Sequence, residues 1–593
     1  MVLIFGGTTE GRTAVRVLDE AGSPYYYSTK SDTQQIECKH GTRVAGGMDA
    51  DAMTDFCTCH DIRLIVDAAH PFASLLHANI AAVSEHLELP VIRFERLYPE
   101  RDESLLWCDT FDDAIEFLEQ HHIRNLLALS GVQTITKMRR YWEKTPCWFR
   151  VLDREESLAL ASRAGFPRER LLFWQNGQDE QALFREIQPD AILTKESGES
   201  GFYSEKIAAA KSLGIPVLVI RRPPLPESFY TVNGEHGLRY RVERLVPGFY
   251  PLRSGFTTGS CATAATVAAL QGLLSGIPQH TAAITLPNGE TITFPVASCT
   301  LTPHSCTCGI TKDAGDDPDV TNGYTIYSEV SLSDTPGIRF LHGEGVGTVT
   351  LPGLGIPLGA PAINATPRAM MIREVERMIH HHEVTSGIDI RIFVPGGTEL
   401  AAKTFNPRLG ITGGISIIGT SGVVRPFSSE AFVNSIRKEI QVAKALGCTH
   451  IVINSGAKSE KTLRTRFPEL PEQAFIHYGN FIGETLKLAE AESIASVTMG
   501  IMIGKAVKLA EGNLDTHSKN VVMNKAFITR LASESHCPAP AIACIADITL
   551  ARELWDIFAD SPAFFDTLVQ HCYSHCLPLL PNTHLEIILI PEQ

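Results

Sequence analysis

The residues that could do chemistry in the first part of this 593-residue sequence follow short apolar runs. The run from Met1 to Phe5 leads into a glycine turn, Gly6-Gly7-Thr8-Thr9-Glu10-Gly11-Arg12. Glycines let a backbone approach a phosphate closely, and a helix N-terminus then supplies N–H donors. The spacing is G-G-x-x-x-G rather than G-x-G-x-x-G, so a tight turn without a ligand is the alternative. We expect a nucleotide cofactor at Gly6, Gly7, Thr8, Gly11 and Arg12.

Ser28, Thr29 and Lys30 end the second apolar run. A site for NAD usually carries an acid at this place, where it binds the ribose 2′-hydroxyl. Hydroxyls and a lysine suit a 2′-phosphate instead. The sequence therefore favours NADPH over NADH at these three residues.

Three further polar segments each follow an apolar run, at the edge where open α/β sheets bind ligands. His70, in Asp67-Ala68-Ala69-His70-Pro71-Phe72-Ala73, could orient or protonate a substrate, or simply form a turn. The other two segments supply the candidate substrate-binding residues Lys195, Ser197, Gly198, Arg221 and Arg222. Their cations could pair with ligand carboxylates, and solvated surface charges are the alternative.

The second part of the sequence carries its own candidates. Thr257, Thr258 and Ser260 open an alanine-rich helix, where they could cap the helix or bind an anion. Asp313 and Asp316 lie in an acidic turn that does not match the EF-hand pattern, so we expect it to orient polar substrate groups. Gly456 follows a strand and could hold a nucleoside cofactor. His517, beside Asp515, could be an oriented acid/base or part of a polar turn.

Composition limits the classes of function. The formal net charge of −15 disfavours general nucleic-acid binding. No apolar run is long enough to span a bilayer, and no leader pattern precedes Gly6, so we expect a cytoplasmic protein with reduced thiols. The 14 cysteines include three local clusters: Cys57-x-Cys59-His60, Cys306-x-Cys308, and His571-Cys572 with His575-Cys576. None has paired C-x-x-C spacing, so we expect no metal site.

The elements that position these residues alternate between strand and helix. Apolar runs predict strands at 2–5, 25–28, 64–67, 91–94, 126–129, 191–194, 217–220, 390–394, 415–418 and 450–453. Helical spacing is found at 12–19, 204–213 and 430–446. This alternation predicts an α/β fold that begins with a Rossmann-like parallel sheet. We expect domains at 1–222 (with an extension to about 245 as the alternative), 251–370 (α+β) and 371–593 (α/β), with a linker at 223–250.

Residues 1–245 resemble the precorrin-6A reductase family of corrin biosynthesis. The resemblance rests on GGTTEGR, DAAHPFA and TKESGESGFYSEKIAAAKSLGIPVLVIRRP. It implies hydride transfer from a nicotinamide cofactor, NADPH or NADH, to a double bond of a corrin precursor.

Residues from about 250 onward resemble cobalt-precorrin-5B (C1)-methyltransferase. The motifs are GFTTGSCATAA, KDAGDDPDVT, GEGVGTVTLPGLGIPLGAPAINATPR, AAKTFNPRLGITGGISIIGTSGVVRP and MIGKAVKLAEGNLDTHS. They imply methyl transfer from S-adenosylmethionine to a cobalt-corrin substrate, which brings its own cobalt. The methyltransferase product is the reductase substrate, so the resemblances together imply a bifunctional corrin-biosynthesis enzyme.

Two rival functions remain open. One is a carrier of corrin intermediates that performs no chemistry. The other is an enzyme with one active half, in which lost function would lie near Ser200 or Ser455. An unrelated NADPH-dependent oxidoreductase is a weaker third. A homo-oligomer and contacts with other corrin-pathway enzymes are open as well, whereas we expect no nucleic-acid or membrane partner.

Overall fold

The computed structural model describes residues 1–32, 34–175, 177–517 and 521–591. Their contacts divide into two compact units. The first comprises Met1–Arg253 and Asn288–Ile292, and the second comprises Ser254–Pro287 and Thr293–Gln593.

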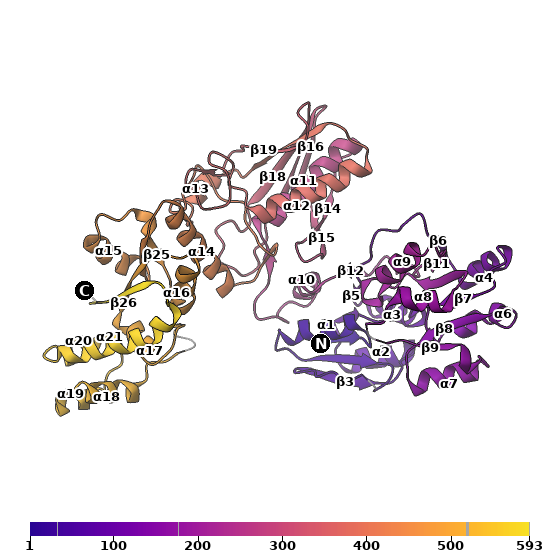
Figure 1. Ribbon diagram of the computed structural model, residues 1–593, viewed down its shortest axis with the longest axis horizontal. Helices are drawn as coiled ribbons and strands as arrows, with labels where there is room; N and C mark the ends of the chain where they lie inside the picture. The colour runs from indigo at the N-terminus through magenta and orange to yellow at the C-terminus, as the bar shows by residue number, and fades with distance from the viewer. Residues whose placement is uncertain (33, 176, 518–520, 592–593) are drawn as a thin grey trace. The chain divides into compact units, whose positions relative to one another are not determined.

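The first unit is built on two parallel six-stranded sheets, one in each of two lobes (Figure 1). The first sheet has the order β12 (Tyr230–Val232), β5 (Val91–Phe94), β4 (Leu64–Asp67), β1 (Val2–Phe5), β2 (Tyr25–Thr29), β3 (Gly41–Ala45). Its helices are α1 (Thr9–Asp19), α2 (Ala50–Cys59), α3 (Ser74–Leu87) and α10 (Glu235–Leu245). Strands β1, β4 and β5 are buried along their whole length, which explains their mostly apolar sequences, in which Asp67 and Arg93 are the charged exceptions.

The second sheet belongs to a lobe formed by residues 106–220. Its order is β6 (Leu106–Cys108), β11 (Val217–Ile220), β10 (Ala191–Lys195), β7 (Leu126–Ala128), β8 (Cys147–Val151), β9 (Leu171–Phe173). Its helices are α4 (Phe111–Gln120), α5 (Thr134–Lys137), α6 (Arg139–Trp142), α7 (Glu155–Arg163), α8 (Glu180–Ile187) and α9 (Tyr203–Ser212). The chain then returns to the first lobe. Parallel sheets of this kind confirm the Rossmann-like class expected for the first part of the chain.

The segment 223–250 is not the linker that we expected. It contains β12 and α10, and Val232, Leu238 and Val242 are buried in the core of the first lobe. The prolines at 223, 224 and 226 lie before these elements, so they mark the return of the chain between lobes rather than the end of the fold.

The first helix of the second unit is α11 (Thr258–Ser275), which is buried on nearly every side. It packs with α12 (Ala365–His381) and against the sheet β16 (Ser298–Leu301), β17 (Ser305–Thr311), β18 (Thr325–Ser333), β21 (Gly387–Phe393), β19 (Ile338–Leu341). Short pairs add β13 (Gly255–Phe256) with β23 (Val423–Val424), β14 (Thr281–Thr285) with β15 (Thr291–Pro295), and β20 (Thr348–Val349) with β22 (Ile411–Thr412). Helix α13 (Gly397–Ala401) follows β21. The alanines of α11 let the sheet and α12 approach it closely.

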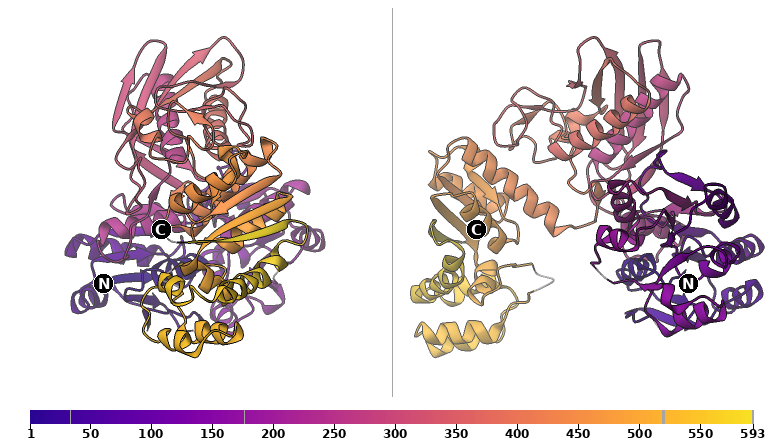
Figure 2. Two further views of the ribbon diagram at one scale, coloured as in Figure 1. Left: turned by 90° about the vertical axis from the view of Figure 1, so that its left-hand side faces the viewer. Right: turned by 45° about the vertical axis from the view of Figure 1, so that its right-hand side comes forward.

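A parallel sheet ends the chain, in the order β25 (Phe475–His477), β24 (His450–Asn454), β26 (Ser496–Met502), β27 (His584–Ile590). Its helices are α14 (Ser429–Ala445), α15 (Ala457–Arg466), α16 (Ile482–Ala491), α17 (Ile503–Ala510), α18 (Lys525–Glu534), α19 (Ala539–Cys544), α20 (Leu554–Ile557) and α21 (Pro562–Cys576). Of these helices, α17 and α18 both pack against α21, in the gold-to-yellow part of Figure 2.

Most predicted strands and helices are confirmed, and the strand expected at 415–418 is wrong. Ile415 and Ile417 form only isolated bridges, to Val346 and Ile363. Glycines on both sides (Gly414 and Gly419) let this stretch follow a neighbouring loop instead of joining a sheet.

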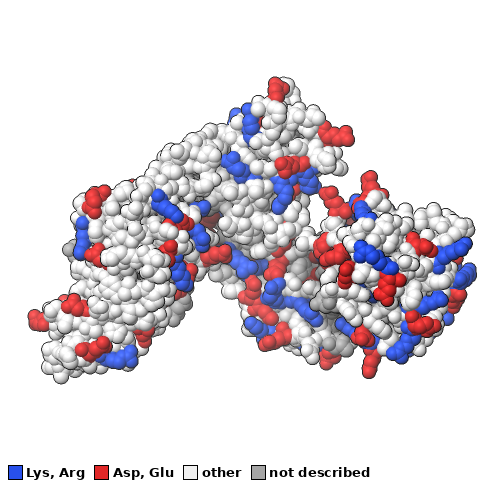
Figure 3. Space-filling model, viewed as in Figure 1, with Lys and Arg blue, Asp and Glu red and all other residues white. Residues whose placement is uncertain are grey.

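The distribution of charged side chains on the surface and the apolar length of the helices agree with what the composition predicts. On the face in Figure 3, basic and acidic side chains are interspersed, without one continuous basic stripe. Within the described residues, no helix is both long and apolar enough to cross a bilayer.

Candidate functional site

The glycine turn after β1 is shaped by close packing as well as by its backbone. A Cβ on Gly6 would lie 2.3 Å from the Tyr27 ring, and one on Gly11 would lie 2.8 Å from the Cα of Gly6. Gly7 has a φ of +93°, which favours glycine, and its N–H donates to Tyr27 Oη (3.0 Å). Thr8 caps α1 by accepting the Gly11 N–H (2.9 Å). The turn therefore feeds a capped helix start, the geometry that binds phosphates.

The end of β2 offers one exposed cation. Ser28 and Thr29 are buried, and Thr29 donates its hydroxyl to the carbonyl of Ser31 (2.8 Å). Lys30 is exposed, as is Arg12 in the glycine turn. Of the three residues expected at the ribose, Lys30 is thus the one whose functional group faces outward.

The loop after β4 is held by a buried charge network. Asp67 accepts from Arg93 Nη1 (2.9 Å) and lies 2.7 Å from His77 Nδ1. Burial alone would raise the pKa of Asp67, but the His77 hydrogen bond and the Arg93 charge outweigh it and hold that pKa below its usual range. His77 Nε2 faces the carbonyl of His70 (3.2 Å). The network thereby fixes the backbone that carries His70.

His70 lies near the side-chain charges of Lys195 and Arg96. Its Nδ1 accepts the N–H of Phe72 (3.1 Å), which leaves Nε2 as the donor of the neutral ring. Burial, and next the charge of Lys195, lower the pKa of His70 to about 3. A ring that stays neutral at physiological pH can orient a substrate by hydrogen bonding. It is not protonated, so it does not act as a general acid. The loop also meets the glycine turn, because Thr8 donates its hydroxyl to the Ala68 carbonyl (2.6 Å).

The loop after β10 brings several predicted residues together. Lys195 lies over the Phe72 ring (5.0 Å), and burial is the main cause that lowers its pKa to about 8. Ser197 accepts Arg96 Nη1 at its carbonyl (2.7 Å). At Gly198, with a φ of +71°, a Cβ would lie 2.9 Å from Arg96 Cβ. Ser197 and Gly198 therefore position Arg96 close to Lys195 and His70.

The two arginines after β11 take different partners. Arg221 pairs with Asp109 (2.7 Å), while Arg222 stacks on Tyr98 at 3.7 Å. Arg222 Nη1 is buried without a hydrogen-bond partner among the described residues. Such a donor is costly to leave unpaired, so it is available to a ligand oxygen.

A cavity of about 950 Å³ opens between the two lobes of this first unit. Its cationic lining residues are Arg101, Lys137, Arg221 and Arg222, and its aromatic ones are Phe72 and Phe111. Arg101 also forms a two-pronged ion pair with Glu196 (3.0 Å for each contact). The lining also contains the acids Glu95, Asp109 and Asp112, and Arg221 is paired with Asp109. Together, the aromatic rings and the cations suit a flat ligand that carries carboxylates. Sequence analysis missed Arg101 and Lys137, because neither follows a predicted strand.

The hydroxyls expected to bind substrate in the second unit tie α11 to a loop. Thr257 accepts the Ser260 N–H (3.2 Å), Thr258 accepts the Ile418 N–H (2.9 Å), and Ser260 donates to the Gly422 carbonyl (2.7 Å). All three side chains are buried. Their contacts fit the capping alternative and leave less of each hydroxyl for a ligand.

The acidic turn after β17 is organised around a buried lysine. Lys312 is 1% exposed and contacts Asp319 (2.7 Å). Asp313 accepts the Gly315 N–H at its side chain (2.8 Å) and the Phe256 N–H at its carbonyl (2.8 Å). Asp316 is exposed. The turn therefore joins β13, where the family motif around Thr257 begins, and presents Asp316 to solvent.

The carboxyl ends of β24, β25 and β26 form a further candidate ligand-binding site. Asn454 accepts the Gly456 N–H (3.0 Å), and Gly456 has a φ of +147°. Lys505, just after β26, donates to Asn480 Oδ1 (2.9 Å), and burial is the main cause that lowers its pKa to about 8. Gly456 and Lys505 thus share one edge of a parallel sheet, where α/β proteins bind ligands.

His517 approaches the same edge. Asp515 accepts the His517 N–H at its side chain (3.0 Å) and forms a bridge with Phe481. Thr516 donates its N–H to the Asn480 carbonyl (3.0 Å). The segment that carries His517 is therefore anchored beside Lys505.

A polar cluster that sequence analysis did not predict lies next to Gly456. Arg408 contacts Glu460 of α15 (3.0 Å), and His477 contacts the same carboxylate. Burial opposes ionisation, but hydrogen bonds from His477 and Arg464 with the Arg408 charge lower the pKa of Glu460 to about 2. Burial also raises the pKa of nearby Glu439. The partners lie far apart in sequence, so no local pattern signals this cluster.

Two different stretches of the chain match two different families of known proteins. Residues 1–236 match the family model described as precorrin-6x reductase CbiJ/CobK, and residues 248–426 match the model described as CbiD. A cobalt-precorrin-5B C(1)-methyltransferase of Prosthecochloris aestuarii is 44% identical over 348 residues, which is 58% of this chain and 94% of the relative. The one from Geobacillus kaustophilus is 44% identical over 323 residues (54% and 87%). A solved structure named CobK precorrin-6A reductase aligns at 22% identity and a TM-score of 0.35, covering 41% of this chain and 97% of that one.

Proposed function

We propose that this chain, which belongs to the family of cobalt-precorrin-5B C(1)-methyltransferases, performs two consecutive steps of corrin biosynthesis. Its second part methylates cobalt-precorrin-5B at C1, and its first part reduces the resulting (cobalt-)precorrin-6A. One observation carries this proposal: two adjacent stretches, 1–236 and 248–426, match families whose reactions follow one another. Placing both steps on one chain raises the local concentration of the intermediate.

The first unit supports the reduction step. The cavity between its lobes has a volume of about 950 Å³, and its cations can pair with carboxylates on the rim of a macrocycle. Arg222 supplies a buried donor without a partner in the described residues, and Lys195 adds a cation near His70. These groups would bind and orient the substrate carbon that receives the hydride.

The glycine turn supports a nicotinamide cofactor. Gly6 and Gly7 lead into the start of α1, and Lys30 is exposed at the end of β2, where a 2′-phosphate would lie. Bound there, NADPH would supply the hydride. Thr8 links this turn to the loop of His70, so the cofactor and substrate regions are held together.

The second unit supports methyl transfer by position rather than by a protein nucleophile. Gly456, Lys505 and His517 gather at one sheet edge, and we assign S-adenosylmethionine to that edge. Bound there, it would supply the methyl group. The task of the protein is to hold the substrate carbon in line with the donor, which requires rigid anchoring of the surrounding loops. Lys505 provides such anchoring through Asn480.

The test is anaerobic turnover of cobalt-precorrin-5B with S-adenosylmethionine, followed by mass spectrometry, with NADPH, NADH or neither. We expect a gain of one methyl group in every case and of two further hydrogens only with a nicotinamide. Methylation without reduction under all conditions would refute the proposed reductase. Bound but unchanged substrate would instead favour the carrier function.

A further inference from the structure

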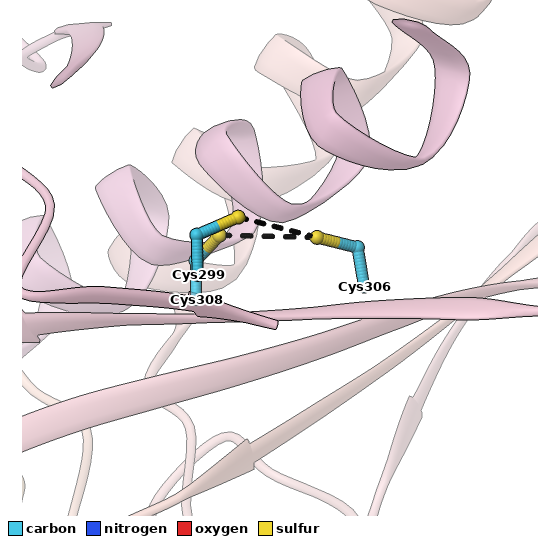
Figure 4. Close-up of side chains that lie close together, drawn as sticks. All are labelled: Cys299, Cys306 and Cys308. Carbon is cyan, nitrogen blue, oxygen red and sulfur yellow. Dashed lines mark hydrogen bonds between the residues drawn. The ribbon is translucent and has the colours of Figure 1, made fainter. Parts of the chain in front are cut away.

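Three cysteines of the second unit converge on one face of a β-hairpin. Cys299 in β16 lies opposite Cys308 in β17, and Cys306 is two residues before Cys308, so it points to the same side. The Sγ of Cys306 is 3.7 Å from that of Cys299 and 3.9 Å from that of Cys308. All three sulfur atoms lie within 4.8 Å of one another. Figure 4 shows them pointing away from the sheet toward a helix.

Gly272 of α11 makes room for these sulfur atoms. A Cβ at this position would lie 2.9 Å from the Sγ of Cys306 and 3.7 Å from that of Cys299. Glycine is less favourable than alanine inside a helix, so its presence here is explained by the space that the sulfur atoms need.

We propose that Cys299, Cys306 and Cys308 bind one thiophilic metal ion, such as Zn²⁺, through three thiolates. Zinc–sulfur bonds of about 2.3 Å in a tetrahedron place neighbouring sulfur atoms about 3.8 Å apart. The distances from the Cys306 Sγ to the other two sulfur atoms, 3.7 and 3.9 Å, match that edge. A water molecule takes the fourth position. Binding forms three metal–sulfur bonds, replaces water ligands of the ion and releases the three thiol protons to solvent, without any change of oxidation state.

Access and burial both fit an ion site. Cys306 and Cys308 are fully buried, while Cys299 is partly exposed, so an ion can reach the sulfur atoms past Cys299. The ion would join β16 to β17 beneath α11.

The experiment titrates the reduced, metal-free full-length protein with Cd²⁺ under anaerobic conditions. Thiolate-to-cadmium absorption should saturate at one equivalent, and added Zn²⁺ should remove it. Cys299→Ser should weaken binding by roughly tenfold or more, since even partners outside the first coordination shell are worth about that factor. The matched control, Cys448→Ser, removes another partly buried thiol and should bind Cd²⁺ like the parent protein.

Two further measurements keep the outcome clear. Cys299→Ser should retain methyl transfer, which shows that its fold is intact, and Zn²⁺ should raise the melting temperature of the parent but not of this variant. Absence of the absorption band, or equal Cd²⁺ affinity in Cys299→Ser and the parent, would overturn the proposal. The Cd²⁺ and Zn²⁺ measurements involve no turnover, so failure of the metal site would leave the proposed function untouched.

Discussion

His77 Nδ1 and Asp67 Oδ2 lie 2.7 Å apart in the interior of the first unit, with Asp67 fully buried. The same carboxylate also neutralises Arg93, an arginine that is itself fully buried within a strand. One acidic residue thus holds a histidine and an arginine, and through His77 the backbone of the His70 loop.

Asp67→Asn should therefore destabilise the first unit strongly. It leaves the Arg93 charge in the interior with weaker compensation, and breaking a buried pair costs about 3–5 kcal/mol. Urea unfolding followed by tryptophan fluorescence reports on this unit, because it contains four of the five tryptophans: Trp107, Trp142, Trp148 and Trp174.

The matched control is Asp32→Asn, whose carboxylate pairs with Arg43 on the surface and should cost less than about 1 kcal/mol. Because the pKa of Asp67 is lowered on folding, its contribution is complete above its unfolded pKa and is lost as the pH falls through the acid range. Equal stability of Asp67→Asn and Asp32→Asn would contradict this account.

His70 should act as a neutral hydrogen-bond donor in the reduction. With a pKa lowered to about 3 by burial and neighbouring cations, it does not titrate between pH 5 and 8. His70→Ala should slow reduction by about tenfold, the scale of one lost hydrogen bond, and His70→Asn should recover part of that loss. Initial rates across this pH range test the assignment. A limb near pH 6–7 that vanishes in His70→Asn would indicate proton transfer instead.

Lys195 should make substrate binding sensitive to alkaline pH. Burial lowers its pKa to about 8, so its charge is present below pH 8 and is lost as the pH rises. If the charged form binds a carboxylate, KM for the corrin should rise roughly tenfold from pH 7 to pH 9, with little change in kcat.

The control for Lys195 is another buried lysine. Burial also lowers the pKa of Lys206 to about 8, but its ammonium donates to the Gly201 carbonyl (2.8 Å). Lys195→Arg should flatten the pH dependence of KM, and Lys206→Arg should preserve it. A dependence that survives in Lys195→Arg would assign it to another group.

Lys30 should decide the choice of nicotinamide. It is the exposed cation at the end of β2, so Lys30→Ala should raise KM for NADPH by about tenfold and leave KM for NADH unchanged. Lys39→Ala removes an exposed lysine of the same region and serves as the control. A parallel loss with both cofactors would argue against a contact with the 2′-phosphate.

Two glycines of the methyltransferase part should respond very differently to alanine. Gly345 and Gly355 have nearly equal φ values, +71° and +68°. A Cβ on Gly345 would lie 1.9 Å from the carbonyl oxygen of Val394, whereas nothing lies within 4 Å of a Cβ on Gly355. Gly355→Ala should cost about 1–2 kcal/mol, the strain of the left-handed region alone.

Gly345→Ala should cost several kcal/mol more and abolish methyl transfer, because the Val394 backbone must move. Thermal unfolding and methylation rates of the two variants provide the test. Similar melting temperatures would show that the loop at Gly345 adapts more easily than this packing implies.

The strands and turns that were predicted correctly are those with a local sequence pattern. The buried strand β1 is apolar throughout and β4 is apolar up to its last residue, Asp67, so local sequence predicts these strands and the loops after them. The motif around Gly6 was placed correctly at the start of a helix for the same reason. Ion pairs between strands and between lobes could not be predicted from the sequence. Examples are Asp67 with Arg93 and Arg101 with Glu196.

Some of the contacts that were not predicted do have a signal in the sequence. An arginine within the apolar run Val91–Phe94 signals a buried partner on a neighbouring strand, and Asp67 fills that role. Cys306 and Cys308 were visible as a pair, but the third thiol depends on the register of β16 against β17, which the spacing of cysteines does not reveal. The Arg408–Glu460–His477 cluster joins three separate segments and has no local signature.

The path of the chain through the first unit has a mechanical consequence. The lobe formed by residues 106–220 is an insertion, joined to the first lobe by one outgoing and one returning segment. These segments lie side by side where Arg222 stacks on Tyr98, and both line the cavity, through Arg101 and Arg222. We infer that two adjacent connections of this kind act as a hinge between the lobes. A macrocycle that grips both walls would therefore lock the hinge angle, so that substrate capture and exclusion of water become a single motion.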